Sequence, residues 1–168
     1  MRNELLEQLF KNKASIIYRY LLKIGCSHHD AEDIVQDAIF KALIYLEAIE
    51  EDKVGAWLFK VALNRYYDLC RKNKRHPLDS FDSENILHHL PVYHPEDQVL
   101  ENEQKQQITR VLKELSGISQ NLLILKYVVG LSYREAAEIL DINEQKAKTY
   151  IYRAKQKFRH HWREFNDE

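Results

Sequence analysis

Side chains that can bind nucleic acid gather on one face of a helix predicted near the C-terminus. Successive helical residues point about 100° apart, and this rotation places four hydrogen-bonding side chains on one strip: Gln145, Thr149, Tyr152 and Gln156. Positive side chains border the strip on both sides: Lys146, Lys148, Arg153, Lys155, Lys157 and Arg159. Amides and hydroxyls can bind base edges, while Lys and Arg neutralise phosphates. The pattern predicts a helix that reads duplex DNA in the major groove.

Two further features predict how this helix is positioned. Ser132 and Glu135 have the spacing of a capping box, which starts a short helix, and Asn143 is a favourable N-cap for the long helix after it. The long helix has an apolar stripe that would face inward: Ala147, Ile151, Ala154 and Phe158. Residues 144–163 contain seven Lys or Arg and one acid, so a charged helix that only faces solvent is the alternative. The polar strip and the capped helix before it favour a DNA-binding helix-turn-helix.

A second basic helix is predicted from about 54 to 74. Its buried side would consist of Leu58, Ala62, Tyr66 and Leu69. Aromatic, amide and charged residues fall on the opposite side or at its margin: Trp57, Lys60, Asn64, Tyr67, Asp68 and Arg71. Rings that stack on bases, among cations that hold phosphates, suit single-stranded or unstacked bases better than closed duplex. The alternative for Trp57, at the start of the helix, is that it anchors the core.

The helix predicted over 28–48 has a buried stripe and an acidic side. The stripe consists of Ala31, Ile34, Val35, Ala38, Ile39, Ala42, Leu43 and Leu46. Asp30, Asp33 and Asp37 align there with Gln36, and Phe40 projects among them. An aromatic residue bordered by carboxylates is a suitable docking surface for a basic protein partner. The alternative is that Phe40 packs on the first helix while the acids are simply solvated.

Composition predicts an all-α protein. The chain has 168 residues, 45% hydrophobic, with four Gly and three Pro, and it has no sustained strand alternation. Pro77, Pro91 and Pro95 indicate a flexible linker over 76–95. We therefore expect two small helical domains, residues 1–75 and 96–168, the second ending in the helix-turn-helix.

Several classes of protein are disfavoured. No 18-residue apolar run could insert the chain into a membrane, and the two cysteines form no recognisable framework, so a reduced cytoplasmic protein is expected. Adjacent histidines such as His28 and His29 point apart on a helix and make no compact metal face. Neither Cys26 nor Cys70 has an activating partner visible in the sequence, and no phosphate-binding Gly loop exists. We expect no metal, no cofactor and no enzymatic activity.

Taken in order along the chain, five features resemble those of bacterial sigma factors. They are DAEDIVQD at 30–37, AWL at 56–58, Asn64 with Asp68 and Arg71, LSYREAAEIL at 131–140, and RAK at 153–155. The resemblance is to the small extracytoplasmic-function group, which has only the second and fourth sigma domains, and it covers nearly the whole chain. The chain departs from the family pattern at Asp141, where Gly is frequent in the turn.

The resemblance implies a sigma factor that binds core RNA polymerase, recognises the −35 and −10 promoter elements and helps to open the DNA. Five residues would bind core polymerase, whose contacting parts are the β′ clamp helices and the β subunit: Asp30, Asp33, Gln36, Asp37 and Phe40. The −10 element would be recognised by Trp57, Lys60, Asn64, Tyr67, Asp68 and Arg71. The −35 element would be read by Gln145, Lys146, Lys148, Thr149, Tyr152, Arg153 and Lys157. Promoter DNA and an anti-sigma factor are further implied partners.

Two other functions remain as alternatives. A stand-alone helix-turn-helix regulator would use residues 131–163 but would leave the acidic helix and the aromatic-basic helix without a role. A helical protein-interaction module would bind only protein through its charged faces and would show no salt-dependent affinity for DNA.

Overall fold

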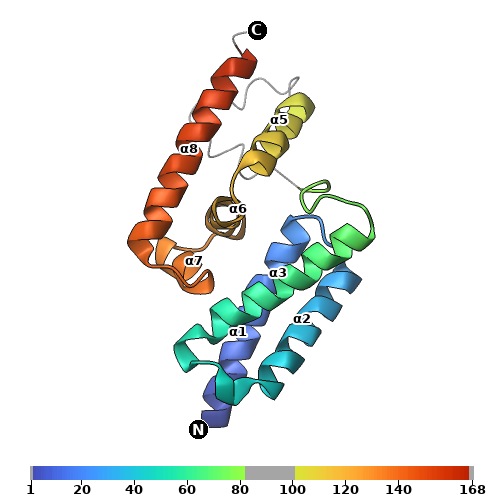
Figure 1. Ribbon diagram of the computed structural model, residues 1–168, viewed down its shortest axis with the longest axis vertical. Coiled ribbons are helices and arrows are strands. Elements are labelled where there is room, and N and C mark those ends of the chain that lie inside the picture. The colour runs from blue at the N-terminus through green and yellow to red at the C-terminus, as the bar shows by residue number, and fades with distance from the viewer. Residues whose placement is uncertain (1, 82–100, 167–168) are drawn as a thin grey trace.

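The computed structural model describes residues 2–81 and 101–166. Within these ranges every regular element is helical and there is no strand, which confirms the predicted all-α class. Figure 1 shows the helices as two neighbouring groups, one at the N-terminal end of the molecule and one at the C-terminal end. No helix in the described ranges is long and apolar enough to cross a membrane.

The first helix set consists of α1 (Arg2–Lys23), α2 (His28–Ile44) and α3 (Val54–Lys72), which pack on one another. Their contact buries large side chains, among them Leu21, Leu58 and Tyr66. Gly25 ends α1 with a φ of +96°, a conformation that favours glycine, and a Cβ there would lie 2.6 Å from Ser80 Cβ. These contacts fix the faces of α2 and α3 that remain outside the core.

The end of α2 differs from the prediction. The helix stops at Ile44 rather than continuing to 48, and two 3₁₀ turns follow, η1 (Leu46–Ala48) and η2 (Glu51–Lys53). Leu43, predicted in the buried stripe, is 55% exposed, because a groove of ≈ 480 Å³ lies beside it between α1 and α2. The stripe residues nearer the start of α2 are buried as predicted: Ala31, Ile34, Ala38 and Ala42.

The second helix set contains α5 (Glu101–Glu114), α6 (Gly117–Leu123), the π-helical η4 (Ile124–Val129), α7 (Tyr133–Ile139) and α8 (Glu144–Asn166). Helices α5, α6 and α7 all pack on α8. Gly130, with a φ of +88°, ends η4 and turns the chain toward α7. Short helices thus hold one long helix along a single side.

The two helix sets are in contact. Helix α1 packs against η4, and α3 packs against α7. The segment that follows α3 belongs to this packed body, since Leu78 and Phe81 are buried. Residues 76–81 of the predicted linker are therefore held in the structure, while residues 82–95 lie outside the described part of the chain.

Candidate nucleic-acid interface

Side-chain caps fix the start of both helices of the helix-turn-helix. The predicted capping box is present: the Ser132 backbone N–H donates to Glu135 Oε2 at 2.7 Å, and the Glu135 N–H donates to Ser132 Oγ at 3.1 Å. Hydrogen bonds from Ser132 to the Glu135 carboxyl lower the pKa of that carboxyl, and the bond from the Ser132 backbone N–H has the largest effect. The predicted N-cap is present too, because the Lys146 N–H donates to Asn143 Oδ1 at 2.7 Å. Between the helices Asp141 has a φ of +54°, which explains why Gly would suit this turn.

Helix α8 presents two chemically distinct sides. Its apolar stripe is buried as predicted: Ala147, Ile151, Ala154 and Phe158. The predicted DNA-reading side chains are exposed, except that Thr149 is half-buried: Gln145, Lys146, Lys148, Tyr152, Arg153 and Lys157. Lys148 pairs with Glu144 at 3.2 Å, and Lys157 Nζ donates to the Glu114 carbonyl at 3.3 Å. We call this outward side the α8 strip; it combines hydrogen-bonding groups with cations and is open to solvent.

Sequence reasoning missed one aromatic residue beside the α8 strip. It is Tyr133, the first residue of α7. Lys126 Nζ lies 4.5 Å and Lys148 Nζ lies 5.9 Å from the centroid of its ring. Its ring lines a shallow depression of ≈ 440 Å³ together with Gln145 and Tyr152. A cation is attracted to the face of an aromatic ring. The ring therefore concentrates positive charge next to the strip, and its place directly after the cap Ser132 is the feature that could have revealed it.

The outward side of α3, which we call the α3 face, carries the residues that the sequence singled out. Lys60, Asn64, Asp68 and Arg71 are exposed, with Arg71 and Asp68 forming an ion pair. Trp57 and Tyr67 are half-buried. The Trp57 ring lies 6.4 Å from that of Tyr45. Trp57 thus contacts the body of the protein while part of its surface remains available.

A groove of ≈ 720 Å³ lies between the α3 face and the second helix set. The first set lines it with Trp57, Lys60, Asn64, Tyr67 and Tyr45, the last of which sequence reasoning missed. The opposite wall comes from α6, α7 and the turn after it: Gly117, Ile118, Asn121, Ile139, Leu140 and Asp141. Burial raises the pKa of Tyr67, so its hydroxyl stays protonated and can donate a hydrogen bond. Aromatic rings, an amide and a cation line one wall of this groove.

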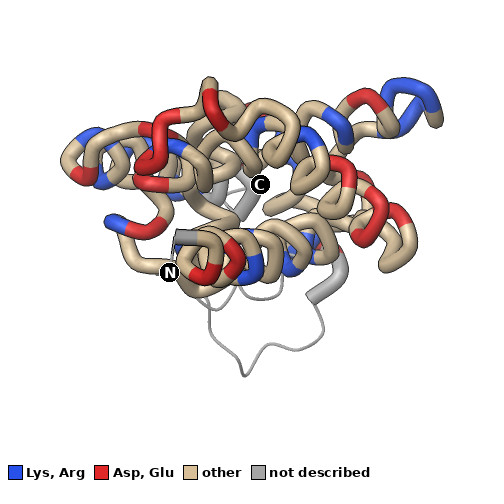
Figure 2. Tube along the Cα trace, turned by 90° about the horizontal axis from the view of Figure 1, so that it is seen from below, with Lys and Arg blue, Asp and Glu red and all other residues tan. Residues whose placement is uncertain are grey.

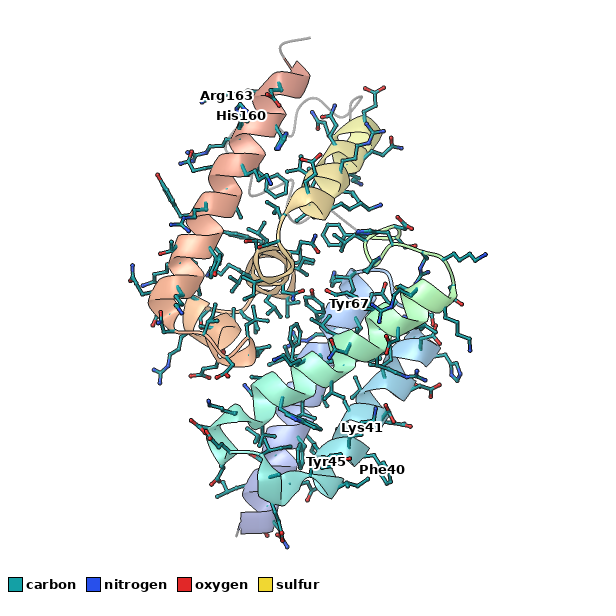
Figure 3. All side chains as sticks on the ribbon, in the orientation of Figure 1. Phe40, Lys41, Tyr45, Tyr67, His160 and Arg163 are labelled. Carbon is teal, nitrogen blue, oxygen red and sulfur yellow. The ribbon has the colours of Figure 1, made fainter. Side chains whose placement is uncertain are left out.

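The acidic side of α2 forms a third surface, the α2 edge, made of Asp30, Asp33, Gln36, Asp37 and Phe40. Phe40 is 63% exposed, so the reading in which it packs on the first helix is wrong. Figure 3 shows Phe40 and Lys41 on the part of α2 that lies away from the second helix set. Asp33 pairs with His29 at 3.4 Å and Asp37 with Lys41 at 3.1 Å. The α2 edge thus places an exposed aromatic ring among carboxylates. The exposed side chains of Ile44 and Tyr45 extend its apolar part.

Charge does not divide the molecule into an acidic and a basic half. Figure 2 shows Lys and Arg interleaved with Asp and Glu along the described helices. In this part of the chain no three His, Cys, Asp or Glu side chains come together in a way that could hold a metal ion. Cys26 and Cys70 are buried, and burial raises the pKa of the Cys26 thiol to about 11. This thiol is therefore protonated at neutral pH and a poor nucleophile.

Comparisons with known proteins match both helix sets. The family described as Sigma-70 region 2 matches residues 9–76, and the family described as Sigma-70, region 4 matches residues 105–158. The ECF RNA polymerase sigma factor SigM of Bacillus subtilis is 32% identical over 154 residues, covering 92% of this chain and 93% of SigM. The chain belongs to the extracytoplasmic-function group of sigma-70 factors. It is a promoter-recognising subunit that acts with RNA polymerase.

Other relatives agree with this assignment. SigW of Bacillus subtilis is 30% identical, covering 90% of this sigma factor and 83% of SigW. The solved structure of the sigma factor RpoE in complex with the anti-sigma factor NepR from Bartonella quintana has 25% identity and a TM-score of 0.50, and the match covers 94% of this chain. Region 2 and region 4 lie in one chain here, which decides against both the stand-alone regulator and the protein-interaction module.

Proposed function

We propose that this sigma factor is a dissociable specificity subunit whose three surfaces have separate tasks and that it carries no catalytic site of its own. The α8 strip reads the −35 element in duplex DNA. The α3 face captures unstacked bases of the −10 element. The α2 edge docks on the β′ clamp helices of core polymerase, in the cytoplasm, and phosphodiester chemistry belongs to the polymerase.

The observation that carries this proposal is the division of α8 into a buried stripe and an exposed strip. Ile151 and Phe158 are buried, whereas Tyr152 is 64% exposed and Arg153 is exposed beside it. A helix held along one side presents the other to the major groove, where side-chain amides pair with bases and cations with phosphates. The capping contacts at Ser132 and Asn143 fix the orientation of this helix.

The aromatic-basic composition of the α3 face supports a role in strand capture. Stacking of a base on an aromatic ring contributes about 1–3 kcal/mol, and Trp57 and Tyr67 offer such rings beside Lys60. Capture of extruded bases stabilises the open form of the DNA relative to the duplex. Tethering the two DNA contacts in one chain raises their combined affinity above that of either alone.

An anti-sigma factor is a further proposed partner. The related RpoE was solved with the anti-sigma factor NepR, and the exposed apolar residues of the α2 edge offer a surface that a protein partner can cover. Phe40 and Tyr45 are more than half exposed. A partner that covers them would compete with core polymerase.

The docking role of the α2 edge is tested by Phe40→Ala, with Leu5→Ala as the matched control. Both side chains are exposed, at 63% and 68%, on neighbouring helices, so neither change should alter the free energy of unfolding by more than about 0.5 kcal/mol. Loss of an interface anchor weakens binding by about 2 kcal/mol or more. We expect Phe40→Ala, but not Leu5→Ala, to lower the affinity for core polymerase in a pull-down titration. Equal affinities for the two variants would contradict the assignment.

A further inference from the structure

Large apolar side chains are exposed at one end of the first helix set. Four residues at the end of α2 or directly after it are 55–63% exposed: Phe40, Leu43, Ile44 and Tyr45. Figure 3 shows Phe40 and Tyr45 at the end of α2 that lies away from the second helix set. A contiguous apolar patch on the surface of a protein marks an interaction site. We therefore expect another molecule to cover this end of α2.

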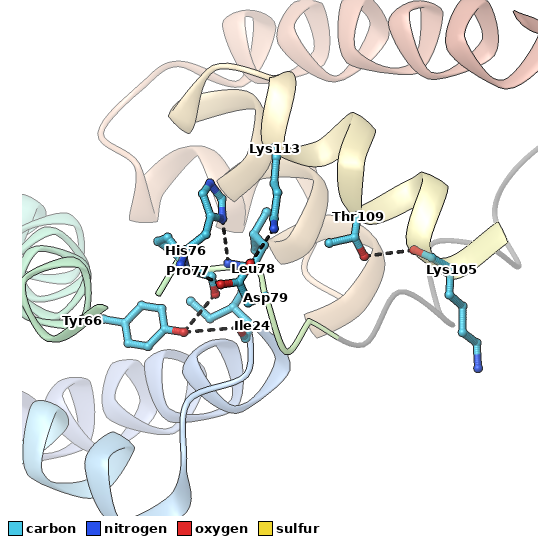
Figure 4. A network of polar contacts seen from close by, with 9 residues as sticks. All are labelled: Ile24, Tyr66, His76, Pro77, Leu78, Asp79, Lys105, Thr109 and Lys113. Atoms are coloured by element: carbon cyan, nitrogen blue, oxygen red, sulfur yellow. Dashed lines mark hydrogen bonds and ion pairs between the residues drawn. The ribbon is translucent and has the colours of Figure 1, made fainter. Parts of the chain in front are cut away.

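The opposite end of the first helix set is already covered. Residues 76–81 pack there, with Leu78 and Phe81 buried. The Tyr66 hydroxyl lies 2.9 Å from the Pro77 carbonyl oxygen and 3.3 Å from that of Ile24, which holds this segment against α1 and α3 (Figure 4). The groove between α1 and α2, by contrast, is lined only by residues of α1, α2 and η1. No described part of the second helix set therefore covers it.

This groove, of ≈ 480 Å³, has an apolar floor. The floor consists of side chains that are buried or half-buried: Leu6, Phe10, Ala14, Ile39 and Leu46. Leu43 also lines the groove, yet it is 55% exposed. One surface thus contains both an apolar hollow and, at its edge, an exposed leucine of a size that fits such a hollow. A surface of this kind is complementary to a second copy of itself.

The polar rim of the groove has the same property. Its polar residues are Asn3, Glu7 and Lys11, and Glu7 pairs with Lys11 at 2.9 Å. One acid and one base leave the rim without net charge, so it does not favour a strongly charged partner as the acidic α2 edge does. In an isologous dimer a contact between two different residues occurs twice, so Glu7 of each copy can pair with Lys11 of the other. The chain has a net charge of only −1, and two copies repel each other weakly.

We propose that this groove binds the same groove of a second copy, so that the free sigma factor forms a dimer with twofold symmetry. Leu43 of each copy enters the hollow of the other, and α1 and α2 of both copies form a layer of four helices. Glu7 and Lys11 fix the register at the rim. Because one groove is a small contact, we expect a weak dimer with a dissociation constant of about 1–100 µM.

The dimer would cover the neighbouring docking surface. Phe40 and Leu43 are three residues apart on α2, and residues at this spacing are neighbours on a helix. A second copy that contacts Leu43 therefore lies against the Phe40 ring. Core polymerase and the second copy then exclude each other. This competition rests on the proposed function of the α2 edge, whereas the dimer itself does not.

Analytical ultracentrifugation of the free chain tests the dimer, with Leu43→Asp as the disrupting variant and Leu5→Asp as the matched control. Leu5 is 68% exposed on α1 but does not line the groove. We expect Leu43→Asp to raise the dissociation constant by about tenfold or more, and Leu5→Asp to change it by less than about twofold. A wild-type chain that stays monomeric at roughly 300 µM, or equal effects of the two substitutions, would overturn the proposal.

An exchange of charges tests the symmetry of the contact. Glu7→Lys leaves two cations at the rim and Lys11→Glu leaves two acids, so at low salt each variant alone should dimerise about three- to tenfold more weakly than the wild type. An equimolar mixture places opposite charges across the interface, and we expect heterodimers with nearly the wild-type affinity. Variants that dimerise no better when mixed than alone would contradict the reciprocal pairing of Glu7 with Lys11.

Titration of the wild-type dimer with core polymerase tests the competition. We expect the dimer to dissociate and a complex with one copy of the chain per polymerase to form, as measured by light scattering after size-exclusion chromatography. A complex that holds two copies per polymerase would overturn the competition. A dimer that persists with no complex formed would instead overturn the docking role of the α2 edge, because the dissociation constant of the dimer is measured without polymerase.

Discussion

Helices α3 and α8 are both basic and amphipathic, yet they differ in what lies in front of them. The α8 strip faces solvent, and a side-chain cap at Asn143 fixes the first turn of the helix. Helix α3 begins after a 3₁₀ turn, has no side-chain cap at Lys53, and looks across a groove of ≈ 720 Å³ toward the second helix set. Similar charge in the two helices therefore does not give them similar access to DNA.

The surroundings of the two helices, more than their composition, separate their two proposed tasks. An open, rigid helix suits the groove of intact duplex DNA, because its side chains can approach base edges without moving. Rings in a concave site suit single bases, which can enter between the walls and stack.

Loss of a ring from α3 should affect strand capture and leave duplex recognition intact. We expect Trp57→Ala to weaken binding of a single-stranded −10 oligonucleotide by roughly 10–100-fold, since a stacked base contributes about 1–3 kcal/mol. Trp57→Phe keeps a ring and should retain most of the affinity. Fluorescence anisotropy with a −10 strand and with a −35 duplex measures the two activities. An equal loss of affinity for the −10 strand and the −35 duplex, at an unchanged melting temperature, would contradict the division of tasks between α3 and α8.

Within the α8 strip, phosphate and base contacts should separate. Arg153→Ala should weaken binding to all −35 sequences and lower the slope of log affinity against log salt by about 1. Gln145→Ala should instead change the preference at one base position by about 1–3 kcal/mol. Arg110 on α5 is exposed but lies outside the α8 strip and the α3 face, so Arg110→Ala is the matched control. Identical profiles of the two α8 variants across a promoter library would contradict this division.

Helix α8 has a side-chain cap at Asn143, whereas α3 has none at Lys53. Substitution of these two residues by Ala should therefore lower the stability by different amounts. Asn143→Ala removes the hydrogen bond from the Lys146 N–H and should cost about 1 kcal/mol of stability, which lowers the melting temperature by about 2–4 °C in a chain of this size. Lys53→Ala removes only exposed ion pairs, whose contribution is about 0–1 kcal/mol. Differential scanning calorimetry compares them. A larger loss for Lys53→Ala than for Asn143→Ala would show that the cap does not fix α8.

The smallest expected effect is a pH dependence at the capping box. The hydrogen bonds from Ser132 hold the pKa of the Glu135 carboxyl below its ordinary value of 4.5 in the folded chain. A lowered pKa stabilises the fold above the ordinary value, and this stabilisation is lost as pH falls from about 4.5 through the folded pKa. Glu135→Gln should therefore lose less stability than the wild type between pH 6 and about 3. If the free energy of unfolding fell equally for the two chains over that range, Glu135 would not contribute to the pH dependence of stability.

Local features were predictable from the sequence because they depend on neighbouring residues. Short-range spacing predicts the helix caps at Ser132 and Asn143 and the burial of Ala147 and Ile151. It also predicts the glycine at position 25, where the backbone has a positive φ. Such patterns place the α8 strip without any knowledge of the rest of the fold.

Long-range features were not predictable. Tyr20 and Asn121 lie 101 positions apart, and no helical period indicates that they meet. Leu43 fits the apolar stripe of α2, yet it is exposed beside the groove between α1 and α2. Periodicity could not predict this exposure, because it does not tell how far the covering helix extends. Tyr45 and the groove that it lines depend on how the two helix sets pack. The comparisons identify the family, while only the packing shows which residues of the α3 face look into a groove.

Reconstituted transcription tests whether this chain directs promoter-specific initiation by core polymerase. Purified chain and core bacterial RNA polymerase would be combined with a genomic promoter library, and start sites would be mapped with and without the chain. The account predicts discrete start sites that need the chain and share two spaced upstream elements, lost with Phe40→Ala and retained with Leu5→Ala. Duplex DNA binding without core binding and without new start sites would contradict it.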